Sequence, residues 1–194
     1  MMKKVLVAAL LFIGSMNMLS AQDSGLWLGG SLLVSGQTVG STTVSTFSII
    51  PEAGYQLNSN WAIGGKIGYT AARQDLAAGT DKTNTTSIVP FGRFTFANTG
   101  NFGFMAQAEL PISFAGGENP GGSSKDVISS FGLRIRPGVV YTISERFGIH
   151  MLMPSLASFS TASNDVTSYK LGINDGYTIQ GYLLNTSIGF VYKF

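Results

Sequence analysis

The 194-residue sequence contains no cysteine, a single histidine and few charged residues. Without cysteine the chain has no disulfide bond, no thiolate metal site and no lipid-modified N-terminal cysteine. Charged residues make up 11% of the chain, which is less than half of the roughly 25% found in soluble globular proteins. A soluble protein with so little charge would not stay dispersed. The composition therefore indicates that much of the outer surface does not face water.

Long hydrophobic runs are also missing beyond the N-terminus, so no membrane-spanning helix is predicted there. The first residues, MMKKVLVAALLFIGSMNMLSAQ, are typical of a secretory signal: Lys3 and Lys4 are followed by an apolar run over 5–13 and small residues up to Ala21. We expect residues 1–21 to be removed, leaving residues 22–194 as one domain. The alternative is a retained N-terminal anchor. A disulfide-free exported protein favours a bacterial envelope.

An excess of positive charge is absent from the expected mature chain. Removal of Lys3 and Lys4 reduces the twelve basic residues to ten, which equals the ten acidic residues. A neutral chain has no electrostatic footprint for nucleic acid, so we expect no nucleic-acid partner.

What the chain does contain is a repeated alternation of apolar and small or polar residues, the pattern of β-strands. Short connections at 58–60, 98–101 and 144–146 alternate with longer ones at 36–46, 72–85, 116–126 and 160–176. Short turns on one side and long loops on the other are typical of outer-membrane barrels. The sequence predicts an all-β fold, an eight-stranded antiparallel up-and-down transmembrane β-barrel. Its expected strands are 26–35, 47–57, 61–71, 86–97, 102–115, 127–143, 147–159 and 177–194.

Each predicted strand has one bulky apolar face, and every ionisable side chain within the strands lies on the opposite face. The ionisable set is Glu52, Lys66, Arg93, Glu109, Arg134, Arg136, His150 and Lys193. The rest of that face is mostly Gly, Ser, Thr and Ala, so it has few charged side chains for a surface in contact with water. A soluble barrel would turn the bulky face inward, but this composition favours bulky side chains facing lipid and charges facing the lumen.

Aromatic residues on the bulky face gather at both ends of the strands, as expected for the two interfaces of a bilayer. Those near the short turns are Tyr55, Trp61, Phe94, Phe96, Phe102, Phe104, Tyr141, Phe147, Phe190, Tyr192 and Phe194. Those towards the long loops are Phe47, Tyr69, Phe114, Phe131, Phe159 and Tyr182.

An eight-stranded barrel has a lumen that side chains largely fill, so the inward charges need partners. A hairpin centred on Ser59 would place Glu52 opposite Lys66, and Glu109 lies at the height of Arg134 and Arg136. With Arg93, these six residues form the predicted lumen charge network. One interpretation is a structural plug, and the other is a gate or a narrow anion-preferring passage.

Five prolines interrupt the predicted strands at similar heights: Pro51, Pro90, Pro111, Pro137 and Pro154. Because proline lacks a backbone N–H, each should mark a bulge or a broken ladder bond. These are either tolerated irregularities or a weakened belt through which an apolar ligand could leave sideways into the membrane.

No catalytic constellation is visible. His150 is the single histidine, and a His-dependent hydrolase needs a histidine beside a nucleophilic serine and an acidic residue. The acidic residues of the loops match no calcium-loop spacing. We expect no enzyme activity, no cofactor and no metal.

The C-terminal sequence GFVYKF, with Phe190, Tyr192 and Phe194 on alternate positions, resembles the C-terminal signature of bacterial outer-membrane barrels. SIIPEAGYQLNSNWAIGGKIGY and FGLRIRPGVVYTISERFGI resemble the small OmpA/OmpX/OmpW-like barrels, often called porin-family proteins. The resemblance implies a Gram-negative outer-membrane location. It also implies that the barrel-assembly machinery reads the last strand, which then closes the barrel against the first.

For the role of the protein, the resemblance leaves three candidates. The first is a structural or surface-interaction barrel, expected to be a monomer among outer-membrane lipids. The second is a conduit for small solutes or, as in OmpW-like barrels, for hydrophobic molecules. The least favoured is a lipid-modifying barrel enzyme.

Overall fold

The computed structural model describes residues 25–40, 42–172 and 186–194. The expected signal peptide (1–21) and residues 177–185 of the last predicted strand lie outside these ranges. Within them the chain forms antiparallel strands and no helix, and none of the described segments is a helix that could cross a membrane. The strands are β1 (Leu26–Val39), β2 (Thr42–Gln56), β3 (Trp61–Leu76), β4 (Gly79–Thr99), β5 (Phe102–Glu109), β6 (Ile112–Glu118), β7 (Ser124–Thr142), β8 (Phe147–Leu152), β9 (Ala157–Ala162), β10 (Thr167–Leu171) and β11 (Ser187–Lys193).

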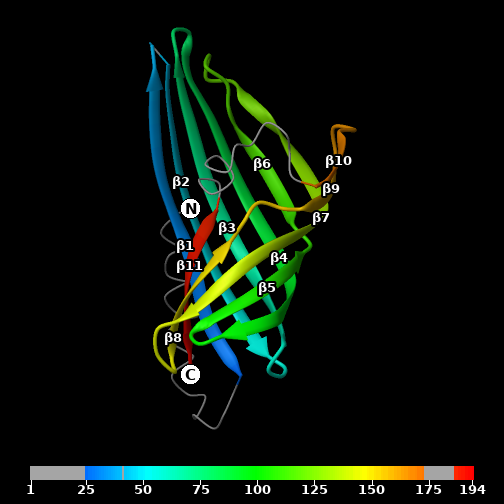
Figure 1. The fold of residues 1–194 in the computed structure, drawn as a ribbon. Helices are drawn as coiled ribbons and strands as arrows, with labels where there is room; N and C mark the ends of the chain where they lie inside the picture. The colour runs from blue at the N-terminus through cyan, green and yellow to red at the C-terminus, as the bar shows by residue number, and fades with distance from the viewer. Residues whose placement is uncertain (1–24, 41, 173–185) are drawn as a thin grey trace.

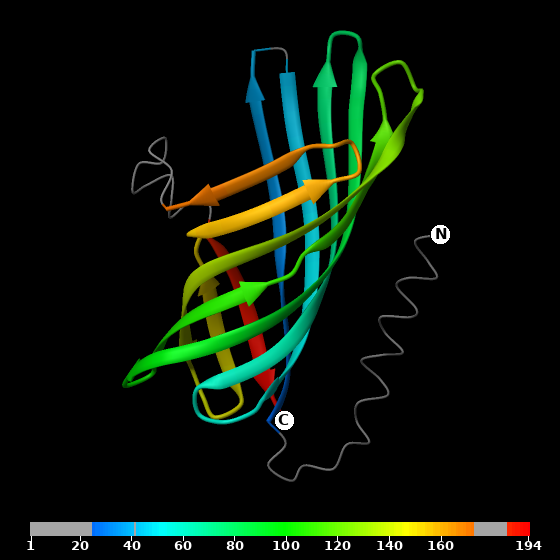
Figure 2. The same ribbon diagram turned by 90° about the vertical axis from the view of Figure 1, so that its right-hand side faces the viewer.

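These strands form an eight-stranded ring, which confirms the predicted barrel (Figures 1 and 2). β5 continues into β6, and β8 into β9, as two interrupted strands of the ring, and β10 and β11 lie on either side of residues 173–185. The ring closes where β11 pairs with β1, from Trp27 opposite Lys193 to Gly30 opposite Phe190, and with β8 on its other edge. The C-terminal strand therefore lies against the first strand, as the resemblance implied.

The three short turns form as predicted, but the four long loops do not. β1 and β2 stay paired up to Val39 opposite Thr42, and β3 and β4 up to Leu76 opposite Gly79. Paired strand likewise runs into 116–126 and 160–176. The threonines, serines and valines of these segments favour a pleated strand. Their polarity reflects strand exposed to solvent at the upper end of the barrel, where Figure 2 shows the long hairpins.

All five prolines lie where the strand pairing is interrupted, although the form of the interruption differs. Pro154 lies in a bulge, because β7 pairs Gly138 with Leu152 but Ile135 with Ala157, a shift of two residues. Pro111 separates β5 from β6, although both segments keep one register on β4.

The other three prolines each lie in a break of the ladder on one edge of their strand, as predicted. Pro51 is unpaired on the β3 side of β2, Pro90 on the β5–β6 side of β4, and Pro137 on the β8–β9 side of β7. On the opposite edge of its strand each keeps a continuous ladder, with Pro90 opposite Gly65 and Pro137 opposite Ala106. At these breaks the proline carbonyl still accepts a hydrogen bond, from the Leu110 N–H at Pro90 and from the Met153 N–H at Pro137, both at 2.9 Å. Register shifts also occur between Thr95 and Ala97 and between Ala115 and Gly117, where there is no proline.

The two faces of the wall are as predicted: bulky side chains point outward and ionisable ones inward. Glu52, Lys66, Arg93, Glu109 and His150 are all buried. Arg134 and Arg136 are half-buried, and Lys193 is exposed at the end of its strand. The aromatic residues of both belts are outward and exposed to varying degrees, except Tyr182, which is outside the described residues.

Not every large side chain points outward. Trp27, Phe91 and Val191 point inward and form a small apolar core, with Trp27 only 3% exposed. Met105 and Leu152 are also buried inside the barrel. The lumen therefore contains an apolar layer beside the charged one.

Candidate functional site: the charged network of the lumen

Lys66 on β3 links two carboxylates that come from strands on either side of its own. The β2–β3 register places it opposite Glu52, and its Nζ lies 3.8 Å from Glu52 Oε2. The same Nζ donates a 2.8 Å hydrogen bond to Glu109 Oε1 on β5. The hairpin centred on Ser59 thus has the expected register, and the lysine also reaches across the lumen to a third strand.

Glu109 is the most enclosed member of the network, with no exposed surface. Its Oε1 accepts a second hydrogen bond, from Gln107 Nε2 at 2.6 Å, and its Oε2 accepts one from Arg134 Nε on β7. A carboxylate with donors on both oxygens is well compensated for its loss of water. Gln107, also fully buried, extends the network because its Oε1 accepts from Arg93 Nε at 2.8 Å.

Arg93 joins the charged layer to the apolar one. Its guanidinium carbon lies 5.0 Å from the centroid of the Trp27 ring and 5.3 Å from that of Phe91. Lys66 Nζ lies 5.4 Å from the Phe91 centroid. These distances are within the range of cation–π attraction, so the aromatic rings stabilise the excess positive charge. The sequence does not indicate these cation–π contacts, because nothing in it distinguishes Trp27 and Phe91 from the apolar residues of the wall.

Arg136, a member of the predicted network, also bonds to the irregular part of the wall. It lies opposite Gln107, two residues from Glu109 on β5. Its Nη2 donates to Leu152 O at 2.7 Å and to Ser187 Oγ at 2.9 Å, and its Nε to Met153 O at 2.8 Å. These acceptors lie at the Pro154 bulge and at the start of β11. Arg136 therefore holds the irregular part of the wall to the closing strand.

His150 is predicted to face the lumen but not to belong to the charge network, and the structure includes it. Its Nδ1 lies 3.3 Å from Glu52 Oε1, and Arg93 Nη2 lies 3.9 Å from the same oxygen. Within the described part of the chain, these three atoms are buried without a hydrogen-bond partner. The histidine fits only because residue 189 is glycine, whose added Cβ would lie 2.6 Å from His150 Nε2. No signal in one sequence could have revealed this clearance.

Taken together, the network spans six strands and leaves the lumen positive, with Lys66, Arg93, Arg134 and Arg136 against Glu52 and Glu109. Its centre is closed, because Met105, Gln107 and Glu109 have no exposed surface. Among the residues described, no three His, Asp or Glu side chains are grouped to hold a metal ion. The arrangement can hold strands together and obstruct the lumen.

The three aromatic residues of the C-terminal signature lie on the outer face of the closing strand. The Phe190 ring is 6.1 Å from that of Phe147 on β8, and Tyr192 and Phe194 meet edge to face at 5.2 Å. Pairs of this kind add to the stability of adjacent strands. All three are exposed on the wall.

A second set of ion pairs lies at the rim, in segments that the sequence assigned to loops. Lys82 Nζ on β4 lies 2.7 Å from Glu118 Oε2 on β6, and Lys125 on β7 pairs with Asp81. The bond from Lys82 lowers the pKa of the exposed Glu118 carboxyl below its ordinary value. These contacts join the β3–β4 hairpin to the β6–β7 hairpin.

Comparison with known proteins bears on the fold. No family model matches the sequence, and no curated protein sequence is similar to it. The crystal structure of neisserial surface protein A (NspA), an outer-membrane β-barrel, superposes with a TM-score of 0.52. The match covers 88% of this chain and 98% of NspA at 18% identity. The chain has the fold of an outer-membrane β-barrel. At this identity the likeness shows the fold alone.

Proposed function

We propose that the protein is an integral outer-membrane β-barrel with a plugged lumen and a structural or surface-interaction role, of the small OmpA/OmpX/OmpW-like kind. The outward belts support a membrane position. From Trp61 to Tyr69 along β3 the outer face covers about 20 Å of height, at about 3.4 Å per residue and a tilt near 40°. That is close to the roughly 25 Å apolar band of outer-membrane barrels.

The single observation that supports the plug is the closed centre of the network. Glu109 holds Lys66, Gln107 and Arg134 at once, and it has no exposed surface. An ion crossing the lumen would have to break several of these bonds, each with charged partners that are costly to leave unpaired in a space with little water.

Recordings in planar bilayers test this role. Protein whose heat-modifiable migration shows a folded barrel should give no steady conductance. The Glu109→Gln variant should give brief openings, because two cations lose their acceptor. Lys82→Met at the rim, outside the lumen, is the matched control and should resemble the unaltered protein. A steady, salt-dependent conductance in the unaltered protein that is lost in Arg134→Ala would instead mean a passage.

For the partners, we infer outer-membrane lipids around the belts and the barrel-assembly machinery at β11, acting on a monomer. The outward position of Phe190, Tyr192 and Phe194 on the closing strand supports this. Replacement of Phe194 by Ser should reduce the fraction recovered in outer membranes after cell fractionation. Val127→Ser, an exposed apolar residue far from the C-terminus, should not.

A conduit is the second candidate, because the Pro154 bulge interrupts the wall and Arg134 keeps 37% of its side chain exposed. Liposome swelling with small sugars and with organic anions tests it. Swelling above that of empty liposomes would favour the conduit.

We infer no catalytic role. His150 is enclosed beside Glu52 and Arg93, with no serine among the contacts described for it, and this supports the inference. Lipid A mass spectra from cells with and without the protein should be identical, and a lost or gained acyl chain would show an enzyme.

A further inference from the structure

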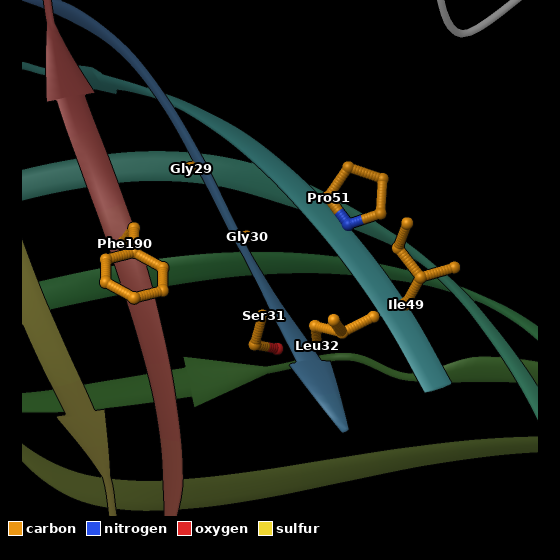
Figure 3. Close-up of a pocket in the computed structure, with 7 residues that line it drawn as sticks. All are labelled: Gly29, Gly30, Ser31, Leu32, Ile49, Pro51 and Phe190. Carbon is orange, nitrogen blue, oxygen red and sulfur yellow. The ribbon is translucent and has the colours of Figure 1, made fainter. Parts of the chain in front are cut away.

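The outer wall has an apolar groove at the junction of β11, β1 and β2, with a volume of about 320 Å³ (Figure 3). Gly30 lies at its floor. Phe190 on one side and Pro51 on the other are its direct cross-strand partners, and Leu32 and Ile49 form the next outward pair along the strands. Phe190, Gly30 and Pro51 form a row of three outward residues across β11, β1 and β2. The groove exists because Gly30, in the middle of this row, has no side chain.

The absence of that side chain is imposed by the backbone. A Cβ on Gly30 would lie 2.8 Å from Ile50 O and 3.0 Å from Pro51 Cα, so a larger residue would push the two strands apart. Gly29, the inward neighbour, is equally confined, since its Cβ would lie 2.2 Å from Phe190 O. The protein therefore cannot fill the groove from its floor, and the surrounding side chains leave it open.

The position of the groove determines what can fill it. Pro51 lies midway along β2 between Phe47 of the upper belt and Tyr55 of the lower belt, so the groove opens at the depth of the hydrocarbon core. An empty apolar space would forfeit the dispersion contacts of its lining, and water finds no partners there. Its volume is within the ~300–1,000 Å³ of small-molecule sites. The molecules present at that depth are hydrocarbon chains.

We propose that the groove over Gly30 holds one acyl chain of a membrane lipid, bound between Phe190 and Pro51 and retained longer than the lipids around the rest of the wall. This inference rests on the proposed membrane position. The bound chain covers the β1–β11 seam at its last described pair, Gly30 with Phe190. A ligand bound to the closed barrel stabilises the closed state, so the lipid would act as a structural ligand of the seam.

Nuclear Overhauser effects between protein methyl groups and lipid chains test the proposal. The full-length mature chain, with Ile and Leu methyl groups labelled, is placed in nanodiscs of dimyristoyl phosphatidylcholine. The methyl groups of Leu32 and Ile49 should show effects several-fold stronger than those of Ile67 and Ile88. These two controls also face outward, and they are 62% and 51% exposed on β3 and β4, outside the groove. Equal effects at all four residues would mean ordinary surrounding lipid and would overturn the proposal.

A filling variant makes the test specific. In Ile49→Trp the indole occupies the groove, and the effect at Leu32 should fall to the level of the controls. In Ile67→Trp, the matched variant on a flat part of the wall, it should stay high. If Ile49→Trp shows no heat-modifiable folded form, Leu32→Phe read at Ile49 replaces it.

Three further outcomes are informative. An effect at Leu32 that persists unchanged in the filled groove would overturn the proposal. Enhancement in detergent micelles but not in nanodiscs would mean an adventitious additive only, and would overturn it too. Failure of the mature chain to insert into nanodiscs would reject the membrane position itself, whereas insertion with uniform effects rejects only the groove.

Discussion

Replacement of Glu109 by Gln should be among the most destabilising single changes in the barrel. The carboxylate is fully buried and accepts bonds from Lys66 at 2.8 Å, Gln107 at 2.6 Å, and Arg134. In the variant, the carboxylate that remains near Lys66 among the described residues is Glu52, at 3.8 Å. Breaking a buried ion pair on one side costs about 3–5 kcal/mol, because the other charge is left uncompensated.

Urea unfolding in phospholipid vesicles measures this cost. The unfolding midpoint of Glu109→Gln should fall while the slope with denaturant stays unchanged, which means that the change is in stability rather than in compactness. Adding Lys66→Met should restore part of the loss, since it removes the unpaired cation and keeps an apolar stem. Glu118→Gln is the matched control at the rim, where its partner Lys82 is exposed, and it should leave the midpoint where it was.

The result that refutes this reasoning is a small effect. A loss below about 1 kcal/mol for Glu109→Gln is the value of a solvated surface pair. It would mean that water reaches Lys66 and Arg134 readily, and that the lumen is wet rather than plugged. A double variant no more stable than the single one would likewise show that the lysine is not left unpaired.

Three other predictions follow from the same contacts. Trp27→Ala should lower the free energy of unfolding by about 3–5 kcal/mol in the same urea assay, because the ring is 3% exposed and packs against Phe91 and Arg93; an effect no larger than that of Ile67→Ala on the outer wall would contradict it. Gly189→Ala should displace the His150 ring, seen as a large change in its NMR signals, whereas Gly92→Ala, whose Cβ has nothing within 4 Å, should leave them unchanged. The Glu118 carboxyl should titrate below its ordinary value of 4.5 by NMR. Lys82→Met should raise that pKa, since the stabilising bond exists only while Glu118 is ionised; the bond is complete above pH 4.5 and is lost as the pH falls through the lowered pKa.

The sequence predicts the wall of this barrel well because the wall follows from a local rule. Side chains alternate between the faces of a strand, so choosing the bulky face of 47–57 and 61–71 places Glu52 and Lys66 in the lumen without knowledge of the rest. The turn at Ser59 then sets their register. Strand ends are harder to predict. The polar segments at 36–46 and 72–85 are predicted as loops, because a strand that extends beyond the membrane lacks the alternating bulky apolar residues by which the other strands are recognised.

The contents of the lumen could be predicted only in part, because they depend on contacts between strands distant in the sequence. That Lys66 bonds Glu109, forty-three residues away, follows from how the ring closes. Trp27 was missed because the first strand has bulky residues on both faces. His150 joins Glu52 only where Gly29 and Gly189 leave space, and a glycine in one sequence does not say which side chain it accommodates.

The charged network of the lumen and the β1–β11 seam depend on each other. Glu52, Arg93 and His150 come from β2, β4 and β8, and on the short side of the ring β8 is separated from β2 by β11 and β1, across the seam. The contacts around Glu52 Oε1 therefore require the closed ring. Interactions formed after the rate-limiting step of folding slow unfolding rather than speed folding. If ring closure is that step, the lumen charges hold a barrel that has already closed, and the glycines at 29 and 189 place them directly behind the seam.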